Sequence, residues 1–458
     1  MRAMLLAVVL LTPAAGLAQV ERYELGRRLK RFEAEWEKVP DPAARKRALA
    51  ILPKASTQFL SLNLTEAART VDDAYWALKS ADPPAAGVRW LDSLCVVPEK
   101  RAVEWKTPEF RVIVRPLYRV EGGSPVGATA SLIGPQGSTE PLSLATVPVT
   151  ANVSAGLQPV NQPGRAAPAV TFDGTITLHL EFGESRITQS VGVSRLSLPD
   201  AAGPDRSTGE GATTVAVCEL ATGLLAGDVP ETALPVASWL AAQPSAAQPF
   251  GRGVGSGDGF WSVVPTAKAA TPCRLYLPAE LSAERPRPLV VALHGAGGSE
   301  NMFFESYGAG HIVKECQKRG WLLVSPRSGL FGTPPVADLV AKLAERYPID
   351  RQRVFLVGHS MGAGQAIDLV QRHPGTFAAV ASLGGGGRVR QKERFDTLPV
   401  FVGVGTADFA LRSSRSLVKA LADAGAKNVT AKEYPDLEHL VIVREALPDV
   451  FKMFDTVR

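Results

Sequence analysis

The sequence predicts a multidomain protein with an N-terminal helical segment, an antiparallel β-sandwich and a C-terminal α/β domain. Apolar residues recur every three to four positions near the N-terminus and every second position in the middle. Towards the C-terminus they form continuous runs between helical segments, which is typical of a mostly parallel sheet with helices on both faces. We expect a signal peptide at 1–18, a helical region at 19–82, a β-sandwich-like domain at 100–200, a mixed linker region at 201–259 and the α/β domain at 260–458.

Composition narrows the class of protein. The chain has 458 residues, of which 45% are hydrophobic and 21% charged, and these values exclude a fully disordered or collagen-like chain. Lys and Arg number 50 against 45 Asp and Glu, so the net charge is only +5, and there is no long basic block. Nucleic acid is therefore not a predicted partner. No segment after the N-terminal run is apolar for long enough to predict a transmembrane helix in the mature protein.

The N-terminus is typical of a secretory signal. Arg2 precedes an apolar run from Leu5 to Leu11, and small residues stand at Gly16 and Ala18. This order predicts cleavage after Ala18 and a secreted or periplasmic protein, with a buried N-terminal helix as the alternative.

The cysteines do not predict a metal or redox motif, because none forms a CxxC pair. They are Cys95, Cys218, Cys273 and Cys316. An exported protein permits disulfides, and Cys273–Cys316 and Cys95–Cys218 are possible pairs, but free buried thiols are an equal alternative.

The helical region divides at prolines. The spacing of a first helix places four apolar residues on one face, namely Leu25, Leu29, Phe32 and Trp36. Pro40 ends this helix, and Asp41-Pro42 is a typical helix start. We expect a second helix to run through residues 50–52 and a third to begin at Thr65, with Pro83-Pro84 ending the helical section.

The next region changes to a period of two. Phe110, Val112 and Val114 alternate with other residues, and a similar alternation continues from Val170 to Leu180. Gly- and Pro-rich clusters separate these runs, so we expect several short strands in an antiparallel β-sandwich. The Gly- and Ser-rich stretch that ends near Gly259 is typical of a flexible connection.

The strongest chemical signal is a serine between glycines. The segment Gly358-His359-Ser360-Met361-Gly362 follows the apolar run Val354–Val357 and precedes a helical pattern from Ala363. A serine on such a sharp strand-to-helix turn has an exposed hydroxyl, and the glycines avoid crowding at the turn. The helix N-terminus favours developing negative charge beside it. We therefore expect Ser360 to be a nucleophile.

A glycine-rich loop lies upstream of this serine. The strand Leu289–Leu293 ends in the segment His294-Gly295-Ala296-Gly297-Gly298. Such a loop lets a backbone N–H approach a reacting carbonyl, so the N–H groups of Ala296 and Met361 are the expected oxyanion donors. We expect His294 to be a structural residue of the loop.

A nucleophilic serine needs a base and an orienting acid, which come after it in the order acid, then histidine. Of the two later histidines, His373 lies before Pro374-Gly375 at a predicted helix end, which leaves His439 as the base. Asp408 follows the strand Val400–Val404 and is the expected acid. Asp436 and Glu438 are the alternatives, and we expect them to be surface charges.

These motifs carry a family resemblance from about residue 261 to the end. The region resembles an α/β-hydrolase of the esterase type, closest to the poly(3-hydroxybutyrate) depolymerase, feruloyl esterase and phospholipase/carboxylesterase group. The matching pieces are residues 293–298, 347–350, 353–362 and 405–408, and His439. The resemblance implies Ser360 as nucleophile, His439 as base, Asp408 as acid, and Ala296 and Met361 as oxyanion donors.

The chain departs from this family pattern at three places. Ala363 stands where many relatives have a second glycine, Val404-Gly405 replaces the usual His-Gly, and Glu438 rather than glycine precedes His439. None of these changes removes a catalytic atom. They leave the subfamily open, and no family resemblance covers residues 19–250.

The sequence thus predicts an exported serine hydrolase that cleaves carboxylic esters through an acyl-enzyme, without a cofactor or metal. The segment Gly384–Leu398 is too short for a helical cap, so we expect an open site for bulky or polymer-linked esters. The N-terminal regions would then target, shield or present substrate. The alternatives are a prolyl-oligopeptidase-like serine peptidase, which lacks support because no regular repeat is present, and a non-catalytic exported binding protein on a hydrolase scaffold.

Overall fold

A computed structural model describes residues 12–104, 106–155, 172–196, 222, 225, 259–266, 270–328 and 332–457. Most of the predicted linker region, Cys218 and the first eleven residues of the predicted signal peptide lie outside the described residues. No helix within the described ranges combines the length and the apolar character that a membrane crossing needs.

The N-terminal region is a layer of helices. These are α1 (Thr12–Lys38), α2 (Pro42–Leu49), α3 (Pro53–Leu60), α4 (Leu64–Lys79) and α5 (Ala86–Ser93). The predicted face of α1 is buried at Leu29, Phe32 and Trp36. Asp41 caps α2 as expected, because its carboxylate accepts hydrogen bonds from the backbone N–H groups of Ala43 and Ala44.

Three details of this region differ from the sequence-based expectations. The second helix ends at Leu49 and residues 50–52 form a turn, because Pro53 begins a new helix with no N–H of its own to pair. A further helix, α5, follows the proline pair that we expected to end the section. Helix α1 is continuous through Ala18, where we predicted cleavage, and the signal peptide stays a prediction.

Two sheets follow the helices. One has the strand order β1-β3-β6 (Leu94–Pro98, Glu109–Pro116, Val149–Ser154). The other has the order β2-β8-β7-β4-β5 (Ala102–Glu104, Ser185–Leu196, Phe172–Phe182, Thr129–Ile133, Thr139–Leu142). All pairs are antiparallel except β2 with β8, which is parallel and departs from the expected pattern.

The two sheets share one hydrophobic cluster. Phe110, Val112 and Val114 point into it from β3, as their alternation predicts, and Leu178 enters it from β7. Trp90 of α5 is buried in the same cluster, which therefore joins the helical layer to the sheets.

The C-terminal region contains an eight-stranded sheet with the order β16-β15-β14-β13-β11-β12-β10-β9. From β9 to β16, the bounds are Phe260–Pro265, Ala270–Tyr276, Arg287–Leu293, Leu322–Pro326, Ile349–His359, Ala379–Leu383, Val400–Gly405 and Val429–Tyr434. The strands from β16 to β12 are parallel, whereas β10 and β9 are antiparallel. The prediction of a mostly parallel sheet is confirmed.

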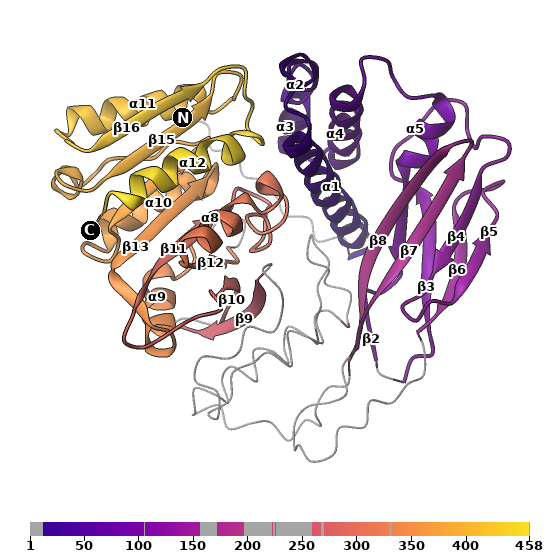
Figure 1. The fold of residues 1–458 in the computed structure, drawn as a ribbon, viewed down its shortest axis with the longest axis horizontal. Coiled ribbons are helices and arrows are strands. Elements are labelled where there is room, and N and C mark those ends of the chain that lie inside the picture. The colour runs from indigo at the N-terminus through magenta and orange to yellow at the C-terminus, as the bar shows by residue number, and fades with distance from the viewer. Residues whose placement is uncertain are drawn as a thin grey trace.

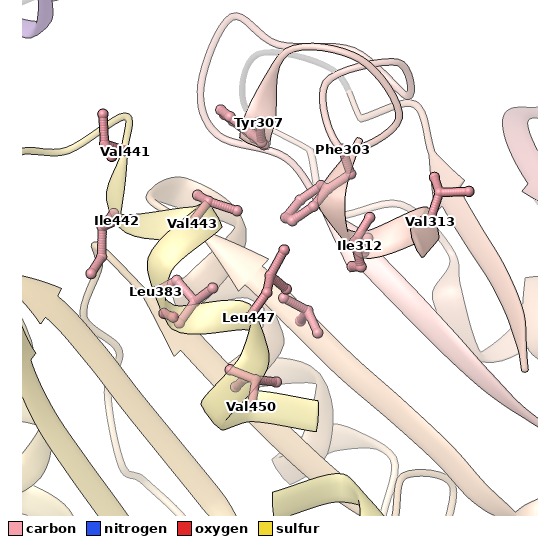
Figure 2. Packing of buried hydrophobic residues seen from close by; sticks show 14 of the residues in the cluster. Phe303, Tyr307, Ile312, Val313, Leu383, Val441, Ile442, Val443, Leu447 and Val450 are labelled. Atoms are coloured by element: carbon pink, nitrogen blue, oxygen red, sulfur yellow. The ribbon is translucent and has the colours of Figure 1, made fainter. Parts of the chain in front are cut away.

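Helices cover both faces of this sheet (Figure 1). One face carries α8 (His311–Arg319) and α12 (Ile442–Asp455), and the other carries α9 (Val336–Arg346), α10 (Met361–Arg372) and α11 (Leu411–Asp423). Figure 2 shows the first face, where Leu447 and Val450 of α12 lie beside Leu383 of β14 and Phe303 and Ile312 pack nearby. Each face therefore has its own hydrophobic cluster.

Helix α1 lies between the two-sheet unit and the C-terminal region (Figure 1). Its apolar face belongs to the same hydrophobic cluster as α12. Trp36 Nε1 donates a hydrogen bond to Glu445 Oε1 at 3.0 Å, and Arg444 Nη1 donates to the carbonyl oxygen of Glu33 at 2.8 Å. Ser306 Oγ donates to the carbonyl oxygen of Gly26 at 3.3 Å. These contacts fix α1 against α12 and against the segment that precedes α8.

The thiols of Cys95, Cys273 and Cys316 are free and buried. The possible Cys273–Cys316 disulfide is therefore wrong, and the alternative of free buried thiols holds for these three residues.

Candidate active site

The candidate residues lie at the carboxyl ends of adjacent parallel strands. Strand β13 pairs with β11 rather than with β12, which precedes it in the chain, and Leu293 at the end of β11 is in register with Gly358. This change of strand order brings the glycine-rich loop after β11 beside the turn after β13. Such a point, where the strand order reverses, is where open α/β sheets bind ligands.

Ser360 occupies a strained turn between β13 and α10. Its φ is 56° and its ψ is −116°, values that a residue with a side chain rarely adopts. The backbone N–H of Ser360 donates to the carbonyl oxygen of Leu383 at 2.9 Å, which ties the turn to β14. A Cβ on Gly358 would collide with Gly362 O, and one on Gly362 would collide with Leu293 O. The turn predicted from the sequence is therefore present, with both glycines sterically required.

His439 and Asp408 form a buried pair. Asp408 follows β15, and His439 lies in the loop after β16. His439 Nδ1 lies 2.9 Å from Asp408 Oδ1, and the same oxygen accepts a hydrogen bond of 2.7 Å from the backbone N–H of Ala410. A carboxylate only accepts, so Nδ1 of the neutral imidazole carries the proton and Nε2 keeps a lone pair that can accept one.

Gly384 is a close neighbour of this pair that sequence reasoning missed. It follows β14 with a φ of 51°, a value that favours glycine. A Cβ at this position would lie 2.9 Å from Asp408 Oδ2 and 3.2 Å from His439 Nδ1. The sequence offers only a run of four glycines here, which does not show which of them faces the pair.

His359 is a second residue that sequence reasoning missed. It is buried beneath the site, and its Nε2 donates to the carbonyl oxygen of His439 at 2.9 Å. Burial, followed by the nearby His439, lowers the pKa of His359 well below its ordinary value. His359 is therefore a neutral side chain that holds the His439 backbone.

Glu438 is buried, which corrects the expectation of a surface charge. Its Oε1 accepts from the backbone N–H groups of Leu440 and Val441, both at 2.9 Å, and its Oε2 accepts from Ser56 Oγ of α3 at 3.1 Å. Glutamate is not among the residues that usually cap a helix N-terminus, so the sequence carries no local signal that could have placed it. Burial raises the pKa of Glu438. Asp436 is exposed, as expected.

His294 and His373 have structural roles. His294 Nε2 accepts from the backbone N–H of Ser328 at 3.2 Å, and its Nδ1 lies 2.9 Å from the carbonyl oxygen of Gly295. It is fixed inside the glycine-rich loop, as the sequence suggests. His373 is the C-cap residue of α10, also as expected. Across the described ranges, no three His, Cys, Asp or Glu side chains are grouped as a metal site requires.

A cavity of about 80 Å³ adjoins the site. Ser360, His439 and Ala296 line it, whereas Asp408 lies behind His439 and Met361 begins α10 beside it. The rest of the wall is mainly apolar and includes two N-terminal helices. From α1 and α3 these residues are Arg22, Leu25, Gly26, Leu29, Ala55, Ser56, Phe59 and Leu60.

The expectation of an open site is therefore wrong. The segment between β14 and β15 has no α-helix, as predicted, and holds only the short 3₁₀ turn Lys392–Phe395. The cover comes instead from α1 and α3, at the other end of the chain. Sequence reasoning searched for a cap only where relatives insert one, and nothing in the periodicity of α1 indicates which domain its apolar face contacts.

Comparison with known proteins relates the C-terminal region to esterases. Residues 272–454 match the model of the family described as Esterase PHB depolymerase. The C-terminal region resembles this esterase family. A curated relative from Nocardia uniformis subsp. tsuyamanensis, named "Putative esterase NocK", is 32% identical over 114 residues. That match covers 22% of this chain and 33% of the relative, so the chain spans about a third of the relative's length.

Solved structures with a similar arrangement include hydrolases. A feruloyl esterase module from Clostridium thermocellum is 14% identical, with a TM-score of 0.38, over 44% of this chain and 89% of that one. The fluorophosphonate-binding serine hydrolase F of Staphylococcus aureus is 13% identical, with a TM-score of 0.36, over 43% of this chain and 98% of that one. Likeness at this level gives no information on the substrate of this chain, which must come from its own residues.

Proposed function

We propose that the protein is a serine hydrolase that cleaves carboxylic esters through an acyl-enzyme. Ser360 Oγ attacks the ester carbonyl carbon while His439 Nε2 takes its proton. The N–H groups of Ala296 and Met361 stabilise the oxyanion, and collapse of this intermediate expels the alcohol, which takes the proton from His439. Water, deprotonated by His439, then attacks the acyl-enzyme and releases the acid. Asp408 orients the imidazole and stabilises its charged form.

The observation that carries the proposal is the His439–Asp408 hydrogen bond of 2.9 Å beside a serine on a strained turn. Ser360 and His439 line one cavity, so a bound carbonyl would meet both. A helix N-terminus at Met361 adds a favourable potential where negative charge develops.

The proposal extends to bulky, apolar esters, including polymer-linked ones. Leu60 and Phe409 line the cavity and remain 56% and 55% exposed, and Leu62, two residues beyond α3, is 75% exposed. Large apolar side chains at the mouth of a site favour apolar substrates, because substrate burial removes them from water. Four large hydrophobic residues are exposed among those that the structure describes. Three of them are the residues just named, and the fourth, Val126, lies in the two-sheet unit.

The segments before the C-terminal region also have proposed roles. The segment 1–18 would direct export, the two-sheet unit would form a separate β-sandwich-like domain, and the helical layer would belong functionally to the site that it covers. A serine peptidase is the alternative activity, because acyl chemistry alone does not separate esters from amides.

The test is hydrolysis by purified protein of p-nitrophenyl esters of increasing chain length and of matched p-nitroanilides. We expect ester hydrolysis that Ser360→Ala reduces by about a thousandfold or more in kcat/KM, because the nucleophile is lost. Preferential cleavage of the anilides would favour the peptidase. Absence of both activities in folded wild-type protein would contradict the proposal and favour a non-catalytic binding protein.

A further inference from the structure

Helix α1 contributes one cationic side chain, Arg22, to the wall of the cavity. Its lining residues Arg22, Leu25, Gly26 and Leu29 follow the spacing of a single helix face. The other three lining residues of α1 are apolar or small, as expected for a face that covers an apolar cavity. Arg22 is the one lining residue with a permanent charge, within the part of the chain that the structure describes. It is half-buried, so its charge is only partly solvated.

Arg22 differs from the other cations of α1. Each of the others has a carboxylate oxygen within 4.0 Å, in the pairs Arg27–Glu24, Arg28–Asp72, Lys30–Glu305, Arg31–Asp72 and Lys38–Glu35. Arg22 makes no ion pair, hydrogen bond or ring contact with any residue in the described ranges. A guanidinium that faces an apolar cavity without a partner among the described residues is available to an anion from outside the chain.

The position of Arg22 relative to Ser360 follows from the glycine-rich loop. A Cβ on Gly295 would lie 3.1 Å from Ser360 Cβ, and a Cβ on Gly297 would lie 3.7 Å from Arg22 Nη2. Two residues of chain span at most about 7 Å, so the guanidinium and the serine lie at the two ends of one short stretch. An ester carbonyl at Ser360 and an anionic group at Arg22 would be separated by a spacer of a few methylenes.

We infer that Arg22 selects esters that carry an anionic group, such as a carboxylate, a few methylenes from the cleaved bond. This inference rests on the proposed esterase function and names its substrate class. The spacer would contact Leu25, Leu29 and Phe59, and the anion would pair with the guanidinium. The pair would be strengthened by the apolar surroundings, since water competes less there. Arg22 is thus a specificity-determining residue supplied by the N-terminal layer.

The test compares matched anionic and neutral esters. For an anion on the acyl side, the pair is mono-p-nitrophenyl adipate and its primary-amide analogue. For an anion on the alcohol side, the pair is the butyrate esters of 3-hydroxybenzoate and 3-hydroxybenzamide. We expect wild type to prefer the anionic member of at least one pair in kcat/KM, and Arg22→Gln to reduce that preference by about tenfold, mainly through KM.

A matched control is Lys38→Gln, which removes one positive charge from the far end of α1. It should leave the anionic-to-neutral ratio as in wild type, which excludes a general effect of net charge. Arg22→Lys should retain part of the preference, because a point charge replaces a planar donor. An unchanged ratio in Arg22→Gln for both substrate pairs would overturn the inference.

A binding measurement separates this inference from the proposed function. Isothermal titration of Ser360→Ala with monomethyl adipate needs no turnover. We expect Ser360→Ala/Arg22→Gln to bind it about tenfold more weakly than Ser360→Ala. Equal affinities would overturn the role of Arg22 whatever the activity. Loss of affinity together with absent hydrolysis in wild type would leave an anion site at Arg22 and contradict only the esterase function.

Discussion

At the scale of single residues, close packing holds the candidate site in place. Ser360 keeps an unfavourable backbone conformation because its N–H is hydrogen-bonded to β14, α10 begins directly after it, and the glycines on both sides allow close packing. His439 is held from its side chain by Asp408 and from its backbone by His359. The imidazole is therefore oriented before any substrate binds, which is the condition for efficient proton transfer.

Gly384 tests this packing directly. Gly384→Ala places a methyl group 2.9 Å from Asp408 Oδ2, so the acid or the imidazole must shift. We expect kcat to fall by about a hundredfold, since a displacement on the order of 1 Å has that effect on a positioned group. Steady-state kinetics with a p-nitrophenyl ester checks it.

The control for backbone strain is Gly425→Ala. Gly425 has a φ of 80° and nothing within 4 Å of an added Cβ, so this variant has a similar conformational cost without contact to the site. A comparable loss of kcat in both variants would show that strain, rather than displacement of the pair, is responsible.

Much of the site could be predicted at this scale, and the reason is local. Gly358, Ser360 and Gly362 lie within one turn whose geometry determines its sequence, and chain order restricts the acid and the base. Glu438 and Gly384 could not be assigned, because their roles depend on which segments pack against them. A carboxylate next to a loop histidine has the same sequence signature whether it is buried or exposed.

At the scale of secondary-structure elements, α3 and the His439 loop are coupled by one buried hydrogen bond. Ser56 Oγ donates to Glu438 Oε2, and Glu438 also accepts from the N–H groups of Leu440 and Val441, just before α12. A change in α3 is therefore transmitted to the residue that precedes His439. This places Ser56 among the positioning residues.

Ser56→Ala leaves Glu438 Oε2 without its partner. We expect a loss of about 1–3 kcal/mol in the free energy of unfolding, which is the usual cost of an unsatisfied buried acceptor. We also expect a few-fold decrease in kcat with little change in KM, because the imidazole is less well held. Denaturant titration and steady-state kinetics measure both quantities.

Ser61→Ala serves as the matched control, because Ser61 is exposed at the end of the same helix and bonds only within it. Wild-type kcat in Ser56→Ala would contradict the coupling.

The elements themselves were predictable wherever a single periodicity dominated. The parallel strands and α1 appear where continuous or helical apolar patterns predict them. The cover over the site was not predictable, because an apolar helix face specifies burial and not the partner. The parallel β2–β8 pair was missed for a similar reason, since three residues carry too short a pattern to give direction.

At the scale of the whole molecule, the first and last helices meet at a buried contact between a carboxyl group and a guanidinium group. Arg444 of α12 lies 3.5 Å from Glu33 of α1, and both side chains are largely buried. Burial raises the pKa of Glu33 to about 8, although Arg444 acts in the opposite direction. The ordinary pKa of a glutamate in an unfolded chain is 4.5. The folded protein therefore binds the Glu33 proton more tightly than the unfolded chain does.

The sign of the pH dependence is set by this raised pKa. The stability that Glu33 contributes is fully present below its unfolded pKa and is lost as the pH rises through about 8. Glu33→Gln mimics the protonated carboxyl, so we expect it to match wild type most closely near pH 5. Near pH 9 its free energy of unfolding should rise relative to wild type by a few kcal/mol.

Denaturant titrations at the two pH values measure this difference. Glu66→Gln, on the exposed side of α4, is the control for removal of one carboxylate. A difference between Glu33→Gln and wild type that stays constant or reverses with pH would contradict the assignment.

Covalent labelling shows whether Ser360 is an activated nucleophile. Wild type, Ser360→Ala and His439→Ala are treated with a fluorophosphonate, and the labelled peptide is located by mass spectrometry. We expect one label on Ser360 in wild type, none in Ser360→Ala and strongly slowed labelling in His439→Ala. Folded wild-type protein that takes up no label, or takes it up at another residue, would contradict it.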